Sequence, residues 1–177
     1  MAASVVSTLS PPPFAKGVNM RGYNSVLTLD KIEGFSQYCD KGAIDIVSFS
    51  FDIGSDSEGA NKGGGLSNSR VAFRGVTVRK SIDRATPLIF NMLAHRKQID
   101  TAGIFLFRDP AKGAETAEHF FTISMGEVFV TKQVLIDPEG AEAGGIPYEE
   151  VTLSANSIEQ NHVLAKKVAS ILLTTGR

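Results

Sequence analysis

The alternation of apolar and polar residues predicts a chain built mainly from β-strands. Six stretches are predicted strands: some have the two-residue period of a strand that buries one face, and residues 101–108 have the continuous apolar run of a buried strand. They are residues 25–32, 43–53, 70–80, 101–108, 118–136 and 148–155. A series of strands of this kind is typical of a β-barrel or a β-sandwich.

One helix is predicted within this series of strands. Thr86 and Pro87 favour a helix start, because threonine can cap exposed backbone amides and proline at the first helical position gives up no needed donor. Four apolar residues then share one face of a helix, namely Leu88, Ile89, Met92 and Leu93. We expect this helix to pack against the face or the mouth of the barrel or sandwich.

The apolar residues change phase in two of the predicted strands. The alternation shifts by one residue at Arg74–Gly75 in the strand 70–80, and again at Gly126–Glu127 in the strand 118–136. An extra residue or a kink bends a strand at such a point. We therefore predict a bulge at the first place and a barrel corner at the second.

The strand 43–53 has two unlike faces at its end. Phe49 and Phe51 alternate there with Ser48 and Ser50. Aromatic side chains are usually buried, whereas serines are usually exposed. The pattern predicts phenylalanines that face the core and serines that face water.

The two ends of the chain differ from its centre. Residues 1–22 contain three consecutive prolines and no periodic apolar face, so they are predicted to be a flexible N-terminal tail. Residues 23–158 form the predicted barrel domain. Residues 159–177 are predicted to be a helical C-terminal extension, because a rough helical stripe carries Val163, Leu164, Val168, Ile171 and Leu172.

A long glycine-rich segment, residues 54–69, separates two of the strands. Loops of this length inside a compact domain are usually functional or disordered. A phosphate-binding loop is not supported, since no Gly-Lys-Ser/Thr ending is present and no helix pattern follows directly.

Charge and the reactive residues argue against several functions. The chain has 18 basic and 19 acidic residues, whereas nucleic-acid binding needs a concentrated basic face. Cys39 is the single cysteine, so an internal disulfide is excluded, and three histidines, His95, His119 and His162, lie in separate segments. No run approaches the roughly 20 apolar residues that cross a bilayer. We expect a protein that assembles rather than catalyses, without metal or cofactor.

Three segments carry a resemblance to a known family: AIDIVSFSF at 43–51, RVAFRGVTVRKSIDRATPL at 70–88 and IPYEEVTL at 146–153. They resemble the haemolysin-coregulated proteins, the tube subunits of bacterial type VI secretion systems. The run Lys-x-x-Asp-x-x-Thr-Pro at 80–87 is the most specific part. The resemblance covers roughly residues 23–158, although Phe49 and Phe51 stand where the family commonly has tryptophans.

The resemblance implies a mainly β fold: a small β-barrel of two sheets with one packed α-helix. It implies a structural protein and not an enzyme, in which subunits close into hexameric rings and the rings stack into a tube. Ser48 and Ser50 would face the bore and the effectors that it carries. The segment 54–69 would contact the next ring, with these candidate residues: Ser57, Glu58, Asn61, Lys62 and Leu66.

The resemblance also implies partners and a location. The partners would be other copies of the chain, a spike protein of the valine-glycine-repeat family, a contractile sheath and small effector proteins, without nucleic acid or membrane insertion. The protein would assemble in the bacterial cytoplasm and then leave, without a signal peptide, for the extracellular space or a target cell.

Two alternative functions stay open at this point. One is a tail-tube protein of a phage or another contractile particle, which would share the fold and differ in its spike and sheath. The other is a secreted hydrolase or binding module with a barrel fold, which would be a monomer in solution.

Overall fold

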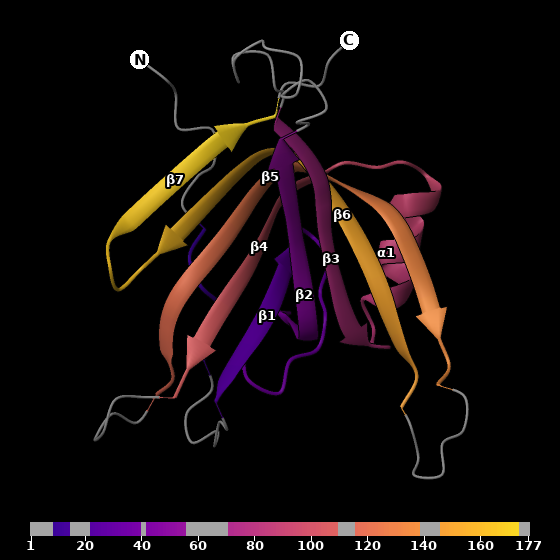
Figure 1. Ribbon diagram of the computed structural model, residues 1–177. Helices are drawn as coiled ribbons and strands as arrows, with labels where there is room; N and C mark the ends of the chain where they lie inside the picture. Colours follow the sequence, from indigo (N-terminus) through magenta and orange to yellow (C-terminus); the bar gives the residue numbers. More distant parts are fainter. Residues whose placement is uncertain are drawn as a thin grey trace, which may run out of the picture.

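A closed β-barrel forms the body of the protein in the computed structural model, which describes residues 9–14, 22–39, 42–55, 71–109, 116–138 and 146–173 (Figure 1). The strands are β1 (Tyr23–Leu29), β2 (Ile44–Ser55), β3 (Val71–Ser81), β4 (Ile99–Arg108), β5 (Glu118–Ile136), β6 (Tyr148–His162) and β7 (Lys167–Leu172). The helix α1 (Thr86–Ala94) lies between β3 and β4 in the chain.

All of these strands belong to one antiparallel sheet, with the order β3-β2-β1-β4-β5-β6-β7. The first part of β6 also pairs with β3, where Leu153 lies opposite Val76, so the sheet closes on itself. The last part of β6 pairs with β7, which extends the sheet beyond the barrel. The predicted barrel with a packed helix is confirmed, but its strands form one continuous sheet and not two.

The predicted bulge in β3 is present and depends on a glycine. Asp52 of β2 pairs with Gly75, and the next residue of β2 pairs with Phe73, which leaves Arg74 as the extra residue. Gly75 has a φ of +114°, and a Cβ atom there would lie 2.9 Å from the carbonyl oxygen of Leu153. Only glycine fits this position without strain.

The predicted corner in β5 is a kink that three strands share. Glu127 has a φ of +50°, and the buried apolar residues of β5 change there from odd to even positions, from Met125 to Val128. The inward-facing positions of β4 and β6 also shift by one residue where these strands pair with the corner of β5. The three strands therefore stay in register across the corner. The amide of Asn156 on β6 donates to the Glu127 carboxylate at 2.7 Å. The corner is confirmed, without an extra residue.

The C-terminal region is a β-hairpin, so the predicted helix over 159–177 is wrong. β6 continues to His162, and β7 pairs back onto it. Ile171 packs against the core, whereas Val168 and Leu172 are each 59% exposed, which is the alternation of a strand. The spacing of these apolar positions is compatible with a helix or with a strand. The strand forms because its backbone groups make hydrogen bonds with those along the edge of β6.

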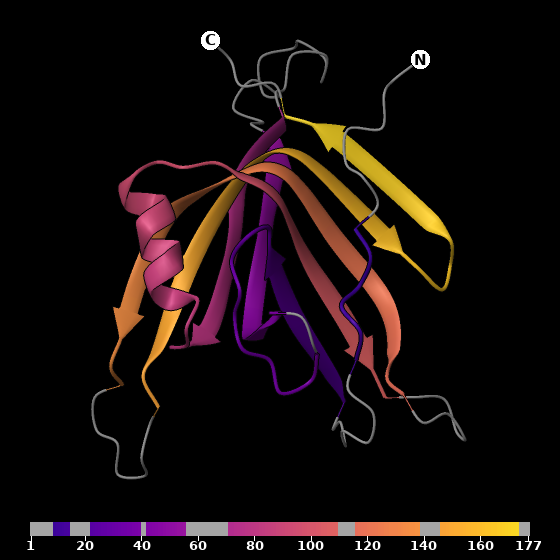
Figure 2. The ribbon, with the colours of Figure 1, turned by 180° about the vertical axis from the view of Figure 1, so that it is seen from behind.

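Part of the predicted N-terminal tail is packed, which corrects the expectation for residues 9–14. Figure 2 shows this segment running along the outside of the sheet. Leu9 and Phe14 pack against a second, smaller core, and Pro12 is buried. This outer core consists of Val26, Cys39, Ala43, Phe105 and Phe107.

One narrow face of α1 packs against the barrel. Ile89 is fully buried, and Met92 and Leu93 pack against the core with partly buried side chains. Leu88 is 43% exposed, so its predicted place on the buried face is wrong. The contact stripe follows positions three and four residues apart, and Leu88 lies beside that stripe.

A buried ion pair lies under the start of α1. Nζ of Lys80 on β3 lies 2.6 Å from Oε1 of Glu149 on β6, and neither side chain is exposed. The same ammonium donates to Oδ1 of Asp83 and to the carbonyl of Ser81, both at 2.8 Å. The Thr86 hydroxyl donates to Glu149 Oε1 at 2.6 Å and makes no capping hydrogen bond, so the predicted threonine cap is wrong. The Lys-x-x-Asp-x-x-Thr run therefore supplies three members of one buried cluster.

Gln133 of β5 completes this cluster. Its Nε2 donates to Oε2 of Glu149 at 2.5 Å and to the carbonyl of Thr86 at 3.2 Å. Its Oε1 is buried and has no hydrogen-bond partner among the described residues. We call the cluster the ionic latch, because it joins β3, β5, β6 and α1 through Lys80, Asp83, Thr86, Gln133 and Glu149.

Removing one partner of the ionic latch should destabilise the barrel more than removing both. Lys80→Met leaves the Glu149 carboxylate buried without its counter-charge, so we expect the free energy of unfolding to fall by about 3–5 kcal/mol. Lys80→Met combined with Glu149→Leu should recover much of this loss, because an apolar pair needs no charge desolvation. Chemical denaturation of the two variants measures the difference.

The matched control lies one residue away on each strand. Arg79 and Glu150 pair at 2.8 Å on the outside of the barrel, with their side chains 44% and 33% exposed. Arg79→Met should change the free energy of unfolding far less than Lys80→Met, since exposed ion pairs contribute little. Equal losses in the two variants would contradict a stabilising role for the buried pair.

Candidate functional site

A polar surface crosses four strands of the barrel on the side away from the core. The pairing of β2, β3, β6 and β5 aligns one row of residues, Ser50, Thr77, Thr152 and Lys132. The next row contains Ser48, Arg79 and Glu150, and the apolar Val134 of β5 lies opposite Glu150. We call the seven polar residues of these two rows the polar wall. The row between them faces inward and contains Phe49, Val78, Val151 and Gln133.

The predicted faces of β2 are confirmed in this part of the strand. Ser48 and Ser50 are exposed, and Phe49 and Phe51 pack against the core as partly buried side chains. A register shift precedes them, and the residue within it, Val47, is 69% exposed. The shift lets the isoleucines at the start of β2 and the phenylalanines near its end lie on the same inner face.

Several side chains of the polar wall form hydrogen bonds or an ion pair with one another. The hydroxyl oxygens of Thr77 and Thr152 lie 3.0 Å apart. Arg79 donates to Oε1 of Glu150 at 2.8 and 3.2 Å and lies 4.5 Å from the ring centroid of Tyr148. The hydrogen bond that Arg79 donates to Glu150 raises the pKa of the Arg79 guanidinium. The wall therefore offers short hydroxyls, a neutralised ion pair and, on β5, the ammonium of the exposed Lys132.

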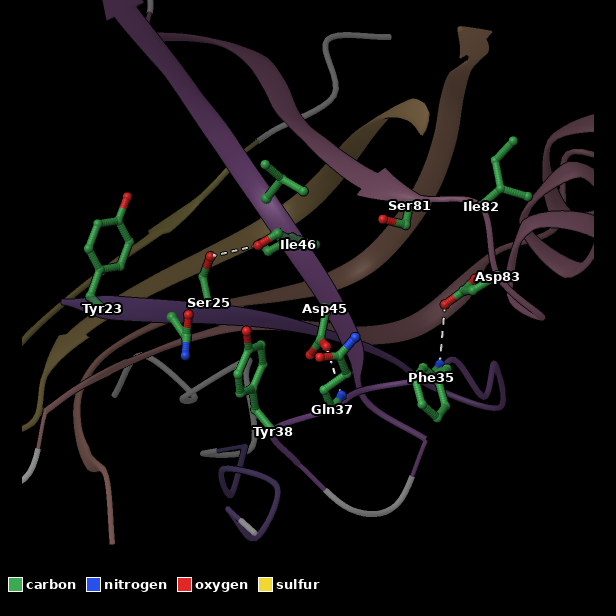
Figure 3. A pocket seen from close by; sticks show the side chains of 12 residues that line it. Tyr23, Ser25, Phe35, Gln37, Tyr38, Asp45, Ile46, Ser81, Ile82 and Asp83 are labelled. Carbon is green, nitrogen blue, oxygen red and sulfur yellow. Dashed lines mark hydrogen bonds between the residues drawn. The ribbon is translucent and has the colours of Figure 1, made fainter. Parts of the chain in front are cut away.

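A groove of about 450 Å³ opens between β1, β2 and the segment after β3 (Figure 3). Four strongly exposed apolar side chains contribute to its lining, namely Tyr23, Phe35, Val47 and Ile82. Asp45 is its central charged group: the hydroxyl of Ser36 and the backbone amide of Gln37 donate to its two carboxylate oxygens. Burial raises the pKa of the Asp45 carboxyl. A groove with a mixed polar and apolar lining, whose carboxylate is already hydrogen-bonded, suits contact with a protein side chain.

The remaining predicted site residues lie outside the described residues. They are the ring-stacking candidates Ser57, Glu58, Asn61, Lys62 and Leu66. Across the described ranges, no group of three or more His, Cys, Asp or Glu side chains could hold a metal ion. The helix that the structure describes is too short and not apolar enough to cross a bilayer.

Two histidines have structural neighbours. His119 lies against the rings of Phe105 and Phe107, its Nε2 lies 2.8 Å from the Thr122 hydroxyl, and burial lowers its pKa. His162 accepts a hydrogen bond from the backbone amide of Ala165 in the turn before β7.

The sequence pattern missed the assembly of the ionic latch, although it contained two signals for it. The Lys-x-x-Asp-x-x-Thr run carried three members. The adjacent Glu149 and Glu150 had to point to opposite faces of a strand, which left one of them inside. Their pairing with Lys80 and Arg79 required the strand register.

The comparisons with known proteins agree with this architecture. The family model described as "Type VI secretion system effector, Hcp" matches residues 26–162. No protein with a curated description matches the chain.

Several solved structures share the fold. Hcp1 from Salmonella typhimurium has 22% sequence identity and a TM-score of 0.67, over 89% of this chain and 99% of that one. A type VI secretion system effector from Yersinia pestis has 19% identity and a TM-score of 0.60, over 83% and 96%. The secreted protein Hcp3 from Pseudomonas aeruginosa has 14% identity and a TM-score of 0.64, over 91% and 100%.

These identities establish the fold, and the family match over residues 26–162 covers most of the chain. The protein therefore belongs to the Hcp family, the secreted tube proteins of type VI secretion systems.

Proposed function

We propose that this Hcp protein forms hexameric rings that stack into a tube, and that the polar wall lines the bore. The observation that carries this proposal is the composition of the wall, which consists of serines, threonines, one lysine and an ion pair that is already satisfied. A bore that lets effectors pass needs side chains that tolerate water and bind weakly. An apolar wall would hold unfolded segments by burying their surface.

Two other surfaces support contacts between subunits. The groove is rimmed by exposed apolar side chains, including Tyr23 and Phe35. β7 is the last strand of the sheet, and its second edge has no strand partner in the described structure. Exposed edges and apolar patches usually mark places where another chain binds. A contact between two different surfaces of identical subunits generates a ring when the rotation closes.

The proposal includes the partners that the family resemblance implies. The tube would form in the bacterial cytoplasm and be expelled by a contractile sheath under a spike protein of the valine-glycine-repeat family, carrying small effectors in its bore. The protein would act by assembly and not as an enzyme. A phage tail tube would share these surfaces, and isolation of the bound spike protein would distinguish the two machines.

The purified protein should form rings with a central hole, measured by negative-stain imaging and by native mass. Val168→Asp places a charge on the exposed face of β7, where Val168 is 59% exposed, and should release monomers. Phe90→Asp is the control, because Phe90 is 62% exposed on α1, away from β7. A wild-type protein that stays monomeric at all concentrations would refute the ring.

A change at Ser50 should alter the carried effectors and leave the fold intact. Ser50→Gln adds a longer amide to the polar wall at an exposed position, and exposed substitutions usually change stability by less than about 0.5 kcal/mol. Effector recovery in pull-downs should change, while the melting temperature stays near that of the wild type.

The control for this change is Ser10→Gln, which alters an exposed serine outside the wall. The inward Phe49→Ala should behave in the opposite way and destabilise the barrel by about 3 kcal/mol or less, because Phe49 is only partly buried. An unfolded Ser50→Gln protein beside a stable Phe49→Ala protein would reverse the proposed faces.

Shortening the segment 54–69 should prevent stacking and spare the ring. Deletion of residues 57–67 removes the candidate stacking residues but keeps both β2 and β3. Loop-closure entropy changes slowly with length, so the barrel should keep its stability. Melting, ring mass and tube formation test this separately: normal tubes, or unfolded monomers, would show that the segment has another role.

A further inference from the structure

We propose that the outer core is a docking groove for a proline-rich peptide, and that residues 9–14 occupy it as a removable strap. The strap has the sequence Leu-Ser-Pro-Pro-Pro-Phe. It lies outside the part of the chain that matches the family, residues 26–162, whereas most of the groove is formed within that part. This inference does not depend on the proposed tube.

The exposure of the strap follows the period of a polyproline helix. Leu9 is half-buried and Pro12 is buried, whereas Ser10, Pro11 and Pro13 are exposed. A polyproline helix has three residues per turn, so residues 9 and 12 lie on the same side. One side of the strap therefore meets the barrel, and the other sides face water.

The end of the strap is anchored by aromatic rings. The ring centroid of Phe14 lies 5.0 Å from that of Phe107 on β4 and 6.2 Å from that of Tyr38, with the second pair stacked at an interplanar angle of 20°. The backbone of Phe14 also forms a bridge with that of Cys39. Grooves lined by aromatic side chains are a common way to bind polyproline segments, because the preformed peptide loses little entropy on binding.

The other end of the strap fits against a glycine. A Cβ atom on Gly103 would lie 3.1 Å from Cδ1 of Leu9 and 2.7 Å from the ring of Phe105. The missing side chain thus leaves room for both Leu9 and Phe105. The docking groove under the strap therefore accepts an apolar residue at one end, a proline in the middle and an aromatic ring at the other end.

The strap shields an apolar surface. The residues beneath it are almost fully buried: Phe105 is 0% exposed and Phe107 is 2% exposed. Opening the strap would expose part of this outer core, and an exposed apolar patch favours binding. The strap is tethered to β1 and therefore has a high effective concentration, so a free peptide of the same pattern competes only when the strap is weakened.

A peptide-binding assay on the chain of residues 1–177 tests whether the docking groove under the strap binds a proline-rich peptide. Phe14→Ala weakens the strap without changing the groove, and the probe is a fluorescent peptide with the sequence of residues 7–16. We expect the probe to bind Phe14→Ala saturably and the wild type at least about tenfold more weakly, because the tethered strap competes in the wild type. A probe in which alanine replaces its phenylalanine should bind neither protein.

Phe90→Ala is the matched control protein, because it removes an exposed phenylalanine and leaves the strap in place. It should bind the probe as weakly as the wild type does. A folded Phe14→Ala protein that binds no probe would overturn the docking groove. Equal binding to the wild type and to Phe14→Ala would overturn it as well, because the probe would then bind elsewhere.

A disulfide tests whether the strap lies on its own barrel. Phe14→Cys places a second cysteine opposite Cys39, which is the single cysteine of the chain, in an antiparallel bridge pair with suitable Cα spacing. Mild oxidation with oxidised glutathione should give a link within one chain, seen as faster migration on a non-reducing gel. Links between chains, or no link at all, would overturn the strap in its stated place.

Discussion

The structure depends on one buried ion pair at the seam where the barrel closes. Lys80 and Glu149 lie directly opposite each other in the pairing of β3 with β6. A slip of two residues would keep every side chain on its face but set Lys80 opposite Val151, which would separate the buried Glu149 carboxylate from the Lys80 ammonium. Since an unpaired buried charge is far more costly than a mismatched apolar contact, the pair fixes the register of the seam. The same carboxylate accepts from Thr86, so it also fixes where α1 begins.

Closure at this seam separates the surfaces of the molecule by their chemistry. The rows that face inward are apolar apart from the ionic latch, and the rows that face outward on β2, β3, β6 and β5 form the polar wall. Exposed apolar side chains elsewhere include Tyr23, Phe35, Val47 and Ile82 around the groove beside Asp45, and Val168 and Leu172 on β7. A surface divided into a wet wall and apolar contact regions is what a subunit of a hollow assembly needs.

Local patterns predicted the parts of the fold that depend on neighbours in sequence. The alternation of Phe49 and Ser50 gave their faces, and the phase change at Gly75 gave the bulge. The patterns failed where distant contacts decide. Residues 159–172 suit a helix or a strand, and only the open edge of β6 selects the strand. Likewise Phe14 has no periodic partners in its own segment, because Phe107 and Tyr38 come from far along the chain. The ionic latch could be predicted only in part. The sequence contained the Lys-x-x-Asp-x-x-Thr motif, but it did not show that β6 and Glu149 pair with this motif.

The closing seam also has a consequence for how the chain folds. β4, β5, β6 and β7 are consecutive hairpins that form from nearby residues, whereas β3 and β6 meet only after the chain between them has folded. Contacts between distant segments require closing a long loop, and this costs entropy before the contacts stabilise the fold. The seam should therefore form late and slowly. Until it forms, the edges of β3 and β6 expose unpaired backbone groups on every nascent chain, and such edges pair readily with other molecules. The step at risk during synthesis is therefore closure of the single barrel, before any assembly begins.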